Sequence, residues 1–481
     1  MVFSSPTFIF YFFPLFFLIY FLTGRSNTVI FLLSLLFYAW GGLNHVPLLI
    51  FYILANFFAG LAIARARRKE WALALGVAAN LSLLIIFKYL GFIENQINFV
   101  LAWLGGGLVM PHSDLALPLG ISFFTFQGIS YLIDIFRGDV QPQRSLLKFA
   151  MYKTMFPQLI AGPIVRYRQI AAKIDHRRVS LYRLRHGLML FTVGLAQKCL
   201  VANTVALPAD AIFKLPSEQL TAATAWLGAV CYMIQIFFDF AGYSNMAIGM
   251  GHMMGFSFPI NFNRPYVAQS VTDFWRRWHM SLSSWFRDYL YLPLGGNRDG
   301  PWCTYRNLFC VFVLCGLWHG AAWTFAAWGL YHGCFLVIER LGLSQALSNV
   351  WRPLRHAYLL LVVCVGWVIF RAESIPQAAH FFSAMLGWGG GTLSLAPAAR
   401  FLTPSVATTI AAALVLCALP PISERRLQVR ARKFIAGGPL AGAVIDGTVT
   451  SAFAAACLAL AVGSALSLAS NTYNPFIYFR F

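Results

Sequence analysis

The chain has 481 residues, of which 59% are hydrophobic and only 11% are charged, and its mean hydropathy is +0.68. A soluble protein of this length needs far more charge to cover its surface, so this composition excludes a soluble globular domain. The formal net charge of +20 is divided among short basic runs between apolar segments, as at 65–69, 173–186 and 424–433. Such runs are typical of the cytoplasmic flanks of membrane spans, where they also meet anionic lipid. We therefore expect membrane lipids and no nucleic acid as partners.

Apolar windows of roughly membrane length follow one another from the N-terminus, since about 20 helical residues cross the hydrocarbon core. These windows are 3–22, 29–64, 71–87, 226–250, 308–338, 358–370, 406–419 and 450–468. The first lacks a basic n-region and an A-x-A-like cleavage site, so we expect it to be retained as a membrane segment. We predict an all-α polytopic membrane protein with roughly 11 to 13 spans and with re-entrant pieces where Gly and Pro cluster.

We expect a single membrane domain that covers residues 1–481. N-terminal spans occupy 1–104, a core dense in motifs occupies about 117–334, and C-terminal spans occupy 355–470. No polar stretch is long enough to fold alone, and no internal repeat is evident. Since many transporters are built from duplicated halves, the missing repeat weakens a transporter interpretation.

The stretch SVTDFWRRWHMSLSSWFRDYLYLPLGGN at 270–297 differs from an ordinary span. Ser270 and Asp273 begin it with the spacing of a helix N-cap. On a helical wheel, most of its aromatic side chains group on one side, and arginines and serines group on the other. This pattern predicts an amphipathic helix at the membrane interface, followed by a turn at LPLGGN.

His319 lies in the apolar stretch LCGLWHGAAWTFAAWGLYHG at 314–333. Ionisable groups inside a membrane are rare and usually face a bundle interior or a watery cavity. A neutral imidazole there can accept a proton and return it, and Gly316 and Gly320 would let backbone or ligand approach closely. We predict a functional His319; the alternative is a structural histidine bonded to a carbonyl of another helix.

His332 follows thirteen residues after His319. On a continuous helix the two rings would point to nearly opposite sides, about 220° apart. Either the helix breaks near Gly320 or only one of the two histidines serves the site, and we interpret His332 as structural.

His279 is the second candidate for chemistry, beside the indoles of Trp275 and Trp278. The alternative is an anchoring residue at the membrane interface, where such residues are common. Among the other ionisable residues in apolar segments, Asp239 could orient a histidine, pair with an arginine such as Arg276, or only add helix polarity. Asp134 and Lys88 are typical of snorkelling or paired residues near span ends and are not assigned to the site.

Several motifs are absent from the sequence. It contains no Walker loop, G-x-G-x-x-G, H-E-x-x-H or G-x-S-x-G elbow, and its nine scattered cysteines form no C-x-x-C pair. Nothing indicates a bound nucleotide, a metal site or a serine nucleophile. If the protein is an enzyme, histidine base chemistry without a covalent protein intermediate is the most economical mechanism.

Motifs along essentially the whole chain resemble the membrane-bound O-acyltransferase family, in particular its branch that acetylates bacterial polysaccharides. The resemblance begins with MVFSSPTFIFYFFPLFF, continues through LPLGISFFTFQGISYLIDIFRGD and FPQLIAGPIVRY, and ends with NPFIYFRF. Its most specific part is DFWRRWHMSLSSWFRDYLYLPLGGN followed by GLWHG.

The resemblance implies a ring of tilted helices, with re-entrant and interfacial helices, around a central tunnel. His319 matches the family's invariant histidine and would be catalytic, and His279 matches the second histidine, on a helix that faces the tunnel. The implied reaction moves an acetyl group from acetyl-CoA or another cytoplasmic thioester, a substrate and not a permanently bound cofactor. In this branch the group passes across the bacterial inner membrane to a periplasmic acetyltransferase partner, and alginate is the polymer that we expect to be acetylated.

One residue departs from the family pattern, because Asn245 stands where we expect an aspartate, and we assign it no function. Rival acceptors within the family are cellulose, peptidoglycan and teichoic acid. Rivals from other classes are a transporter or flippase for a polymer or lipid-linked sugar, and a non-catalytic scaffold for a periplasmic acetylase.

Overall fold

The structure is a computed structural model that describes residues 2–105, 109–111, 113, 115–388, 396–420, 427–429, 431, 439–470 and 473–475. Most of the basic run at 424–433 and residues 476–481 of the C-terminal motif lie outside the described residues. The regular secondary structure within the described ranges is helical throughout.

The helices vary in length from 4 residues in α8 to 32 in α12 and α23. The first group contains α1 (Phe13–Leu22), α2 (Asn27–Gly41), α3 (Val46–Arg65), α4 (Lys69–Leu84), α5 (Leu90–Trp103), α6 (Ile121–Arg137), α7 (Leu146–Thr154), α8 (Phe156–Leu159) and α9 (Tyr167–Asp175). The central group contains α10 (Leu181–Ala196), α11 (Asn203–Ile212), α12 (Ala222–Met253), α13 (Val271–Arg277), α14 (Met280–Phe286), α15 (Gly300–His319) and α16 (Trp323–Ile338). The C-terminal group contains α17 (Ser344–Ser348), α18 (Arg352–Arg371), α19 (Ile375–Met385), α20 (Ala396–Ala399), α21 (Pro404–Ala418) and α23 (Pro439–Ser470).

Five short π-helical segments extend or join these helices, and they mark places where the helical register shifts. They are η1 (Phe8–Phe12), η3 (Ile85–Tyr89), η4 (Gln197–Ala202), η7 (Arg287–Tyr291) and η8 (Glu339–Leu343). Short 3₁₀ turns are η2 (Leu43–His45), η5 (Ser217–Gln219) and η6 (Pro265–Val267).

Six helical stretches of the described chain are long and apolar enough to cross a membrane, so the protein is a multi-pass membrane protein. They are Leu43–Arg65, Lys69–Trp103, Leu181–Ile212, Ala222–Met253, Arg352–Arg371 and Val444–Ser470. Phe8–Leu22, Asn27–Gly41 and Pro404–Ala418 are shorter apolar helices. The number is below the 11 to 13 spans estimated from sequence, in part because the window at 308–338 is divided between α15 and α16.

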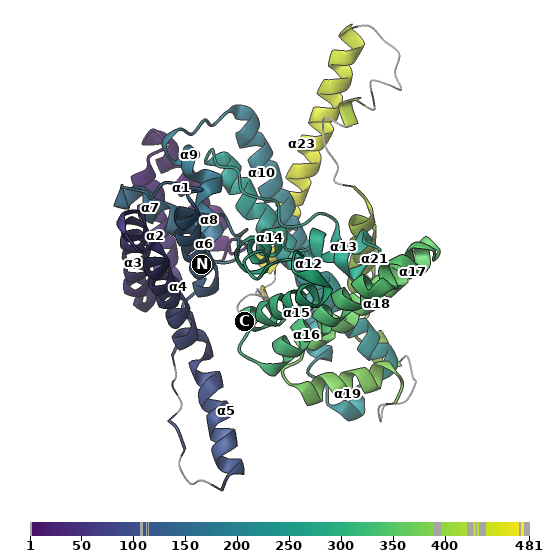
Figure 1. The fold of residues 1–481 in the computed structure, drawn as a ribbon. Coiled ribbons are helices and arrows are strands. Elements are labelled where there is room, and N and C mark those ends of the chain that lie inside the picture. The colour runs from purple at the N-terminus through teal and green to yellow at the C-terminus, as the bar shows by residue number, and fades with distance from the viewer. Residues whose placement is uncertain are drawn as a thin grey trace.

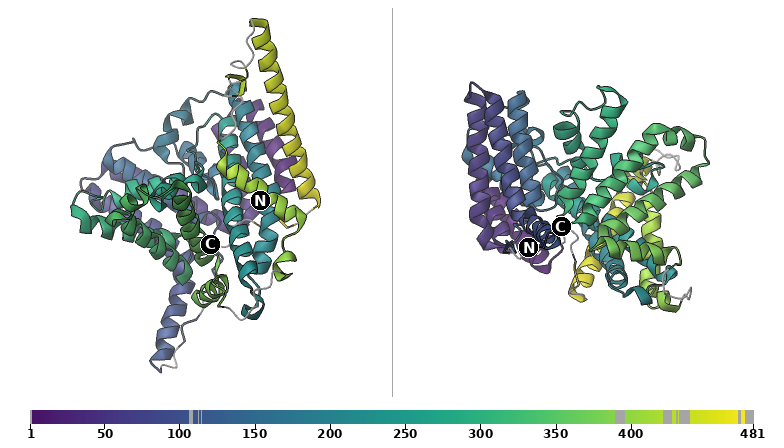
Figure 2. Two further views of the ribbon diagram at one scale, coloured as in Figure 1. Left: turned by 90° about the vertical axis from the view of Figure 1, so that its right-hand side faces the viewer. Right: turned by 60° about the horizontal axis from the view of Figure 1, so that its bottom comes forward.

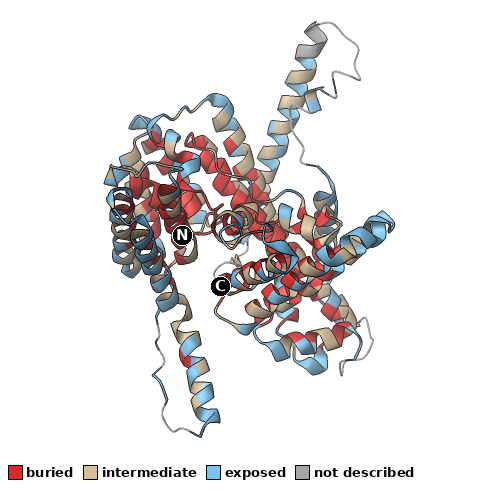
Figure 3. Cartoon of the chain, in the orientation of Figure 1, coloured by how far each residue is buried: buried red, intermediate tan, exposed pale blue. Residues whose placement is uncertain are grey.

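The long helix α12 lies at the centre, between a group formed by α2, α3, α4 and α6 and a group formed by α15, α16, α18 and α19 (Figures 1 and 2). In its most apolar stretch 78% of the residues are buried, against 17% for Lys69–Trp103 and 11% for Val444–Ser470. The projecting helices α5 and α23 are correspondingly pale in Figure 3, while the red, buried residues gather around α12. The core therefore surrounds α12.

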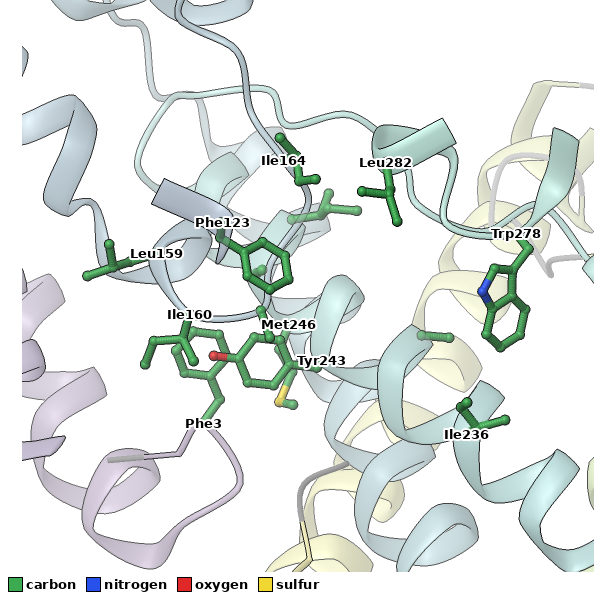
Figure 4. Packing of buried hydrophobic residues seen from close by; sticks show 14 of the residues in the cluster. Phe3, Phe123, Leu159, Ile160, Ile164, Ile236, Tyr243, Met246, Trp278 and Leu282 are labelled. Atoms are coloured by element: carbon green, nitrogen blue, oxygen red, sulfur yellow. The ribbon is translucent and has the colours of Figure 1, made fainter. Parts of the chain in front are cut away.

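Aromatic side chains connect the N-terminal segment to this core. Phe3 stacks on Tyr243 of α12 with ring centroids 4.3 Å apart, and Ile160 lies beside the pair (Figure 4). Phe156 meets Phe3 edge-on at 6.1 Å. Such contacts supply large buried area with specific geometry, so the N-terminus is part of the core.

Helices α10 and α12 approach each other closely at paired glycines. Gly187 faces Gly249 and Gly194 faces Gly242, and a Cβ at any of the four positions would collide with the carbonyl oxygen of the glycine opposite. Small residues allow membrane helices to pack backbone against backbone. This contact holds α12 in place against α10.

Candidate active site

Two cavities meet at His319. The larger, of about 750 Å³, lies between α13, α14, α15 and η8 and is lined by both His279 and His319. The smaller, of about 160 Å³, is lined by His319, Trp318 and Lys88 together with the start of α6. A third cavity of about 310 Å³ shares Lys88 with the second. His319 is therefore shared by two of these cavities.

His319 is the last residue of α15, and the helix breaks directly after it. Gly320 is extended, and α16 begins at Trp323. The imidazole is 9% exposed and lies among aromatic rings, with centroids 5.3 Å from Trp328 and 5.2 Å from Phe370. The break was one of the two alternatives left open by the sequence, and it frees the ring of His319 from the helical register of His332.

Lys88 and Tyr89 hold the end of α15. The Lys88 ammonium donates to the carbonyl oxygens of Trp318 at 2.6 Å and His319 at 3.1 Å. The Tyr89 hydroxyl donates to the carbonyl of Leu317 at 2.6 Å. The last carbonyls of a helix lack partners within it, and these donors satisfy three of them from another segment.

Lys88 is paired, as one of its two interpretations from sequence had it, but its partners are backbone carbonyls at the end of α15. It lies in η3, in the middle of the apolar stretch Lys69–Trp103, and its third contact is the Ser122 hydroxyl at 3.3 Å. A lone lysine within an apolar run was the signal that could have placed it at the site, because an intramembrane cation requires nearby acceptors.

The glycines around His319 make room for a helix and not for a ligand. A Cβ at Gly316 would collide with the carbonyl oxygen of Phe325 in α16, and one at Gly320 would collide with the Phe325 ring. Gly329 of α16 meets the Phe312 carbonyl in the same way. The prediction of a close approach is confirmed, but the group that approaches is α16.

His279 lies at a second break. The single helix predicted before the turn at LPLGGN is wrong, because α13 ends at Arg277 and α14 begins at Met280, with His279 between them at φ 42° and ψ 53°. The predicted N-cap is confirmed, since the Ser270 side chain accepts from the Asp273 N–H at 3.1 Å. The ring of His279 is 2% exposed and faces the larger cavity.

A polar residue that sequence reasoning missed contacts His279. Asn261 Oδ1 lies 3.0 Å from His279 Nδ1, and the Asn261 carbonyl accepts from the Met280 N–H at 2.9 Å. The rings of His279 and Trp318 are 6.4 Å apart, so the indole lies between the two candidate histidines. In the sequence Asn261 begins the polar run NFNRPY at 261–266, to which no role was assigned.

The second half of the 270–297 stretch is anchored to α6. Trp285 stacks on Phe126 with centroids 3.8 Å apart and donates from Nε1 to the Phe126 carbonyl at 2.9 Å. The Tyr289 hydroxyl donates to Asp134 at 2.7 Å, which confirms the prediction that Asp134 is paired. These contacts hold α14, and with it one wall of the larger cavity, against α6.

An ion pair outside the apolar spans fixes the same wall. Arg166 donates to Asp288 at 2.6 Å, and the side chains are 4% and 13% exposed. Burial raises the pKa of the Asp288 carboxyl, but the guanidiniums of Arg287 and Arg166 outweigh it, so the pKa is below its usual value. The carboxylate is therefore charged at neutral pH and keeps both arginines in place.

His332 stays outside the site, in keeping with its structural interpretation. It is fully buried within α16, lines neither cavity at His319, and packs against Trp275, Trp328 and Tyr331 with centroids 5.0–5.2 Å away. Within the described part of the chain, neither of its ring nitrogens has a hydrogen-bond partner.

Two residues of α12 that the sequence analysis singled out, Asp239 and Asn245, also lie away from the cavities. Asp239 forms an ion pair with Lys198 at 2.9 Å, a cation that the sequence analysis did not consider. Asn245 donates to Gln197 Oε1 at 2.8 Å, which gives this departure from the family pattern a structural partner.

The larger cavity has a polar mouth. Arg276, Arg287 and Arg340 are exposed and line it together with Asp273 and Glu339. The Glu339 carboxylate has a structural role, since it accepts from the N–H groups of Val271 and Thr272 at the start of α13. This mouth can attract a phosphorylated molecule, whereas the smaller cavity carries a single cation, Lys88.

A multi-pass membrane protein with a buried imidazole between two cavities has the layout of an enzyme that transfers a group within the membrane. The family model "MBOAT, membrane-bound O-acyltransferase family" matches residues 141–375, which contain both cavity histidines. The chain belongs to this family and is an acyltransferase.

The relatives are similar to the chain over its whole length. It is 41% identical to the "Probable alginate O-acetylase AlgI" of Pseudomonas putida and 40% identical to that of Azotobacter vinelandii, over 100% of both chains in each case. It is 37% identical to the "Peptidoglycan O-acetyltransferase" of Helicobacter pylori, over 82% of this chain and 81% of that protein.

Proposed function

We propose that the protein transfers an acetyl group from acetyl-CoA, or another acetyl thioester, through the bacterial inner membrane for O-acetylation of an exopolysaccharide. The main support is that His319 lines two cavities that differ in size and in the number of cations that line them. The larger cavity, with three arginines at its mouth, suits a thioester donor that carries phosphates. The smaller cavity suits an acceptor hydroxyl that arrives from the other side.

In this proposal His319 is the general base. The imidazole takes the proton of the acceptor hydroxyl while the hydroxyl oxygen attacks the thioester carbonyl. The C–O bond forms as the C–S bond breaks. The proton then passes to the leaving thiolate, which departs as the thiol. Such proton transfer contributes roughly 10²–10⁴-fold to a rate. His279 assists by positioning the substrate from the same cavity.

Alginate is the proposed polymer, with a periplasmic acetyltransferase as partner. The names of the full-length relatives support this choice, and the name of the Helicobacter pylori relative makes peptidoglycan the alternative acceptor. The basic runs at 65–69 and 173–186 support a cytoplasmic side for the loops that carry them, from which a thioester donor would enter.

The experiment compares polymer acetylation in producing cells that carry the wild-type chain, His319→Ala or His380→Ala. His380 is an exposed histidine distant from the cavities in the fold and serves as the matched control. Mass spectrometry of alginate and of peptidoglycan should show that H319A removes acetyl groups from alginate alone, at equal membrane levels of each variant. Unchanged acetylation in H319A would refute the proposed base.

The two rival classes make different predictions for the same variants. A transporter without histidine chemistry would keep moving its substrate in H319A. A scaffold would release no CoA from labelled acetyl-CoA in wild-type membranes, with or without the periplasmic partner. CoA release that depends on His319 excludes both.

A further inference from the structure

His279 is held by one side chain whose hydrogen bonds leave little freedom. Asn261 Oδ1 is 3.0 Å from His279 Nδ1, 3.2 Å from the Ser281 N–H nitrogen and 2.8 Å from the Ser281 hydroxyl. Its Nδ2 donates to the Ser244 hydroxyl of α12 at 3.0 Å. Asn261 is 1% exposed and His279 is 2% exposed, so neither bond competes with bulk water.

The backbone decides which way the Asn261 amide faces. The N–H of Ser281 can only donate, so the amide atom that it contacts is the oxygen and not the nitrogen. The Ser281 hydroxyl agrees with this orientation, because it accepts from the Ile164 N–H at 3.0 Å and so directs its own proton to Asn261.

The orientation of the amide in turn determines the tautomer of the histidine. An amide oxygen only accepts, so His279 Nδ1 must carry the proton that it donates to Asn261. Nε2 then carries the lone pair. Among the described residues Nε2 has no hydrogen-bond partner, although the ring is buried and lines the 750 Å³ cavity.

The surrounding rings hold the imidazole in this orientation. Phe240 meets it edge-on with ring centroids 4.6 Å apart, and the ring of Trp318 lies 6.4 Å away. The backbone bond from the Met280 N–H to the Asn261 carbonyl, at 2.9 Å, keeps the two segments in register while His279 adopts its positive φ. The lone pair of Nε2 thus has a defined position on a ring that lines the same cavity as the candidate base, His319.

We propose that Asn261 is a positioning residue for acyl transfer: it fixes His279 in the Nδ1–H tautomer and directs the Nε2 lone pair into the cavity that His319 also lines. Neutral His279 is then an acceptor for a proton or hydroxyl of the substrate, and its Nε2 has no proton to donate to the thioester carbonyl until it has accepted one. This inference rests on the proposed function, because it assigns His279 its part in that reaction.

The kinetic test uses membranes of the producing cell, which contain the full chain with its natural partners. Initial rates of acetyl transfer from labelled acetyl-CoA into polymer give a maximal rate and a KM for each variant. We expect Asn261→Ala to lower the maximal rate about 10- to 100-fold with a KM within about twofold of wild type. Asn261→Asp keeps the acceptor oxygen and should restore the rate to within about fivefold.

Ser281→Ala is the matched control, because it removes a bond to the same amide oxygen but leaves the bond to His279. It should lower the maximal rate less than about threefold. The proposal would be overturned if Asn261→Ala were as active as Ser281→Ala. It would also be overturned if Asn261→Ala lowered only the amount of folded protein and left the rate per folded molecule unchanged.

A second measurement is made on the wild-type chain and uses a variant only to assign the signal. Nitrogen NMR of the wild-type chain labelled at histidine should show a protonated Nδ1 and a bare Nε2 for His279, assigned by its loss in His279→Gln. A protonated Nε2 would refute the proposal directly. If wild-type membranes transfer no more acetyl groups than H319A membranes, the proposed function fails instead, and the NMR result still decides the tautomer.

Discussion

His279 and His319 lie at breaks between helices, whereas His332 lies within the regular helix α16. At each break, donors and acceptors from distant segments satisfy the backbone, Asn261 at the first and Lys88 at the second. The ring at a break can point into a cavity because the helical register no longer directs it. Within α16, neighbouring turns and α18 enclose the ring of His332, and a Cβ at Gly366 would lie 2.5 Å from its Nε2. The comparison teaches that burial alone does not mark a functional histidine.

The largest effect is expected from breaking the support beneath His319. Lys88→Met removes the donor to the carbonyls of Trp318 and His319 and leaves them without a charged partner. Because these two bonds hold the end of α15, where His319 lies, we expect the rate of polymer acetylation per folded molecule to fall about 10- to 100-fold. Lys148→Met is the control, since Lys148 forms an exposed pair with Asp175. Equal rates in the two variants would show that the support does not matter for the reaction.

A smaller effect is expected from pushing α16 away from α15. Gly316→Ala places a methyl group against the Phe325 carbonyl, and overpacking of this kind costs about 1–3 kcal/mol. Thermal unfolding in detergent should show a lower midpoint for this variant, and activity should fall with it.

The matched control for that substitution is Gly447→Ala in α23, where a Cβ meets no atom within 4 Å. Its midpoint should stay the same or rise, because alanine favours a helix over glycine. If both variants unfold at the same temperature, the close contact between α15 and α16 contributes no stability.

The smallest effect is expected at the histidine inside a regular helix. His332→Leu replaces two buried ring nitrogens that lack partners among the described residues, so stability should be unchanged or higher. Polymer acetylation should stay within about threefold of wild type, since the ring touches neither cavity. A loss comparable to that of H319A would place His332 in the reaction and end the distinction between the two kinds of histidine.

Local patterns predicted much of the molecule. Hydropathy identified a multi-pass helical membrane protein, a capping residue identified the start of α13, and the rarity of intramembrane imidazoles singled out His319. The break near Gly320 was one of two alternatives that the spacing of His319 and His332 allowed. The membrane class and the start of α13 were confirmed because each depends on residues close together in the sequence, whereas the role of His319 stays a prediction.

The sequence by itself thus determined the class of protein and the residue types from which a site could be built. Only the tertiary structure decided that Lys88 bonds to backbone 230 residues away, that Asn261 contacts His279, and that α13 and α14 are separate helices. The physical reason is that a backbone carbonyl or a positive φ has no side-chain signature. The helical pattern of apolar residues continues across the break between α13 and α14, and that break is stabilised by hydrogen bonds to residues outside the pattern.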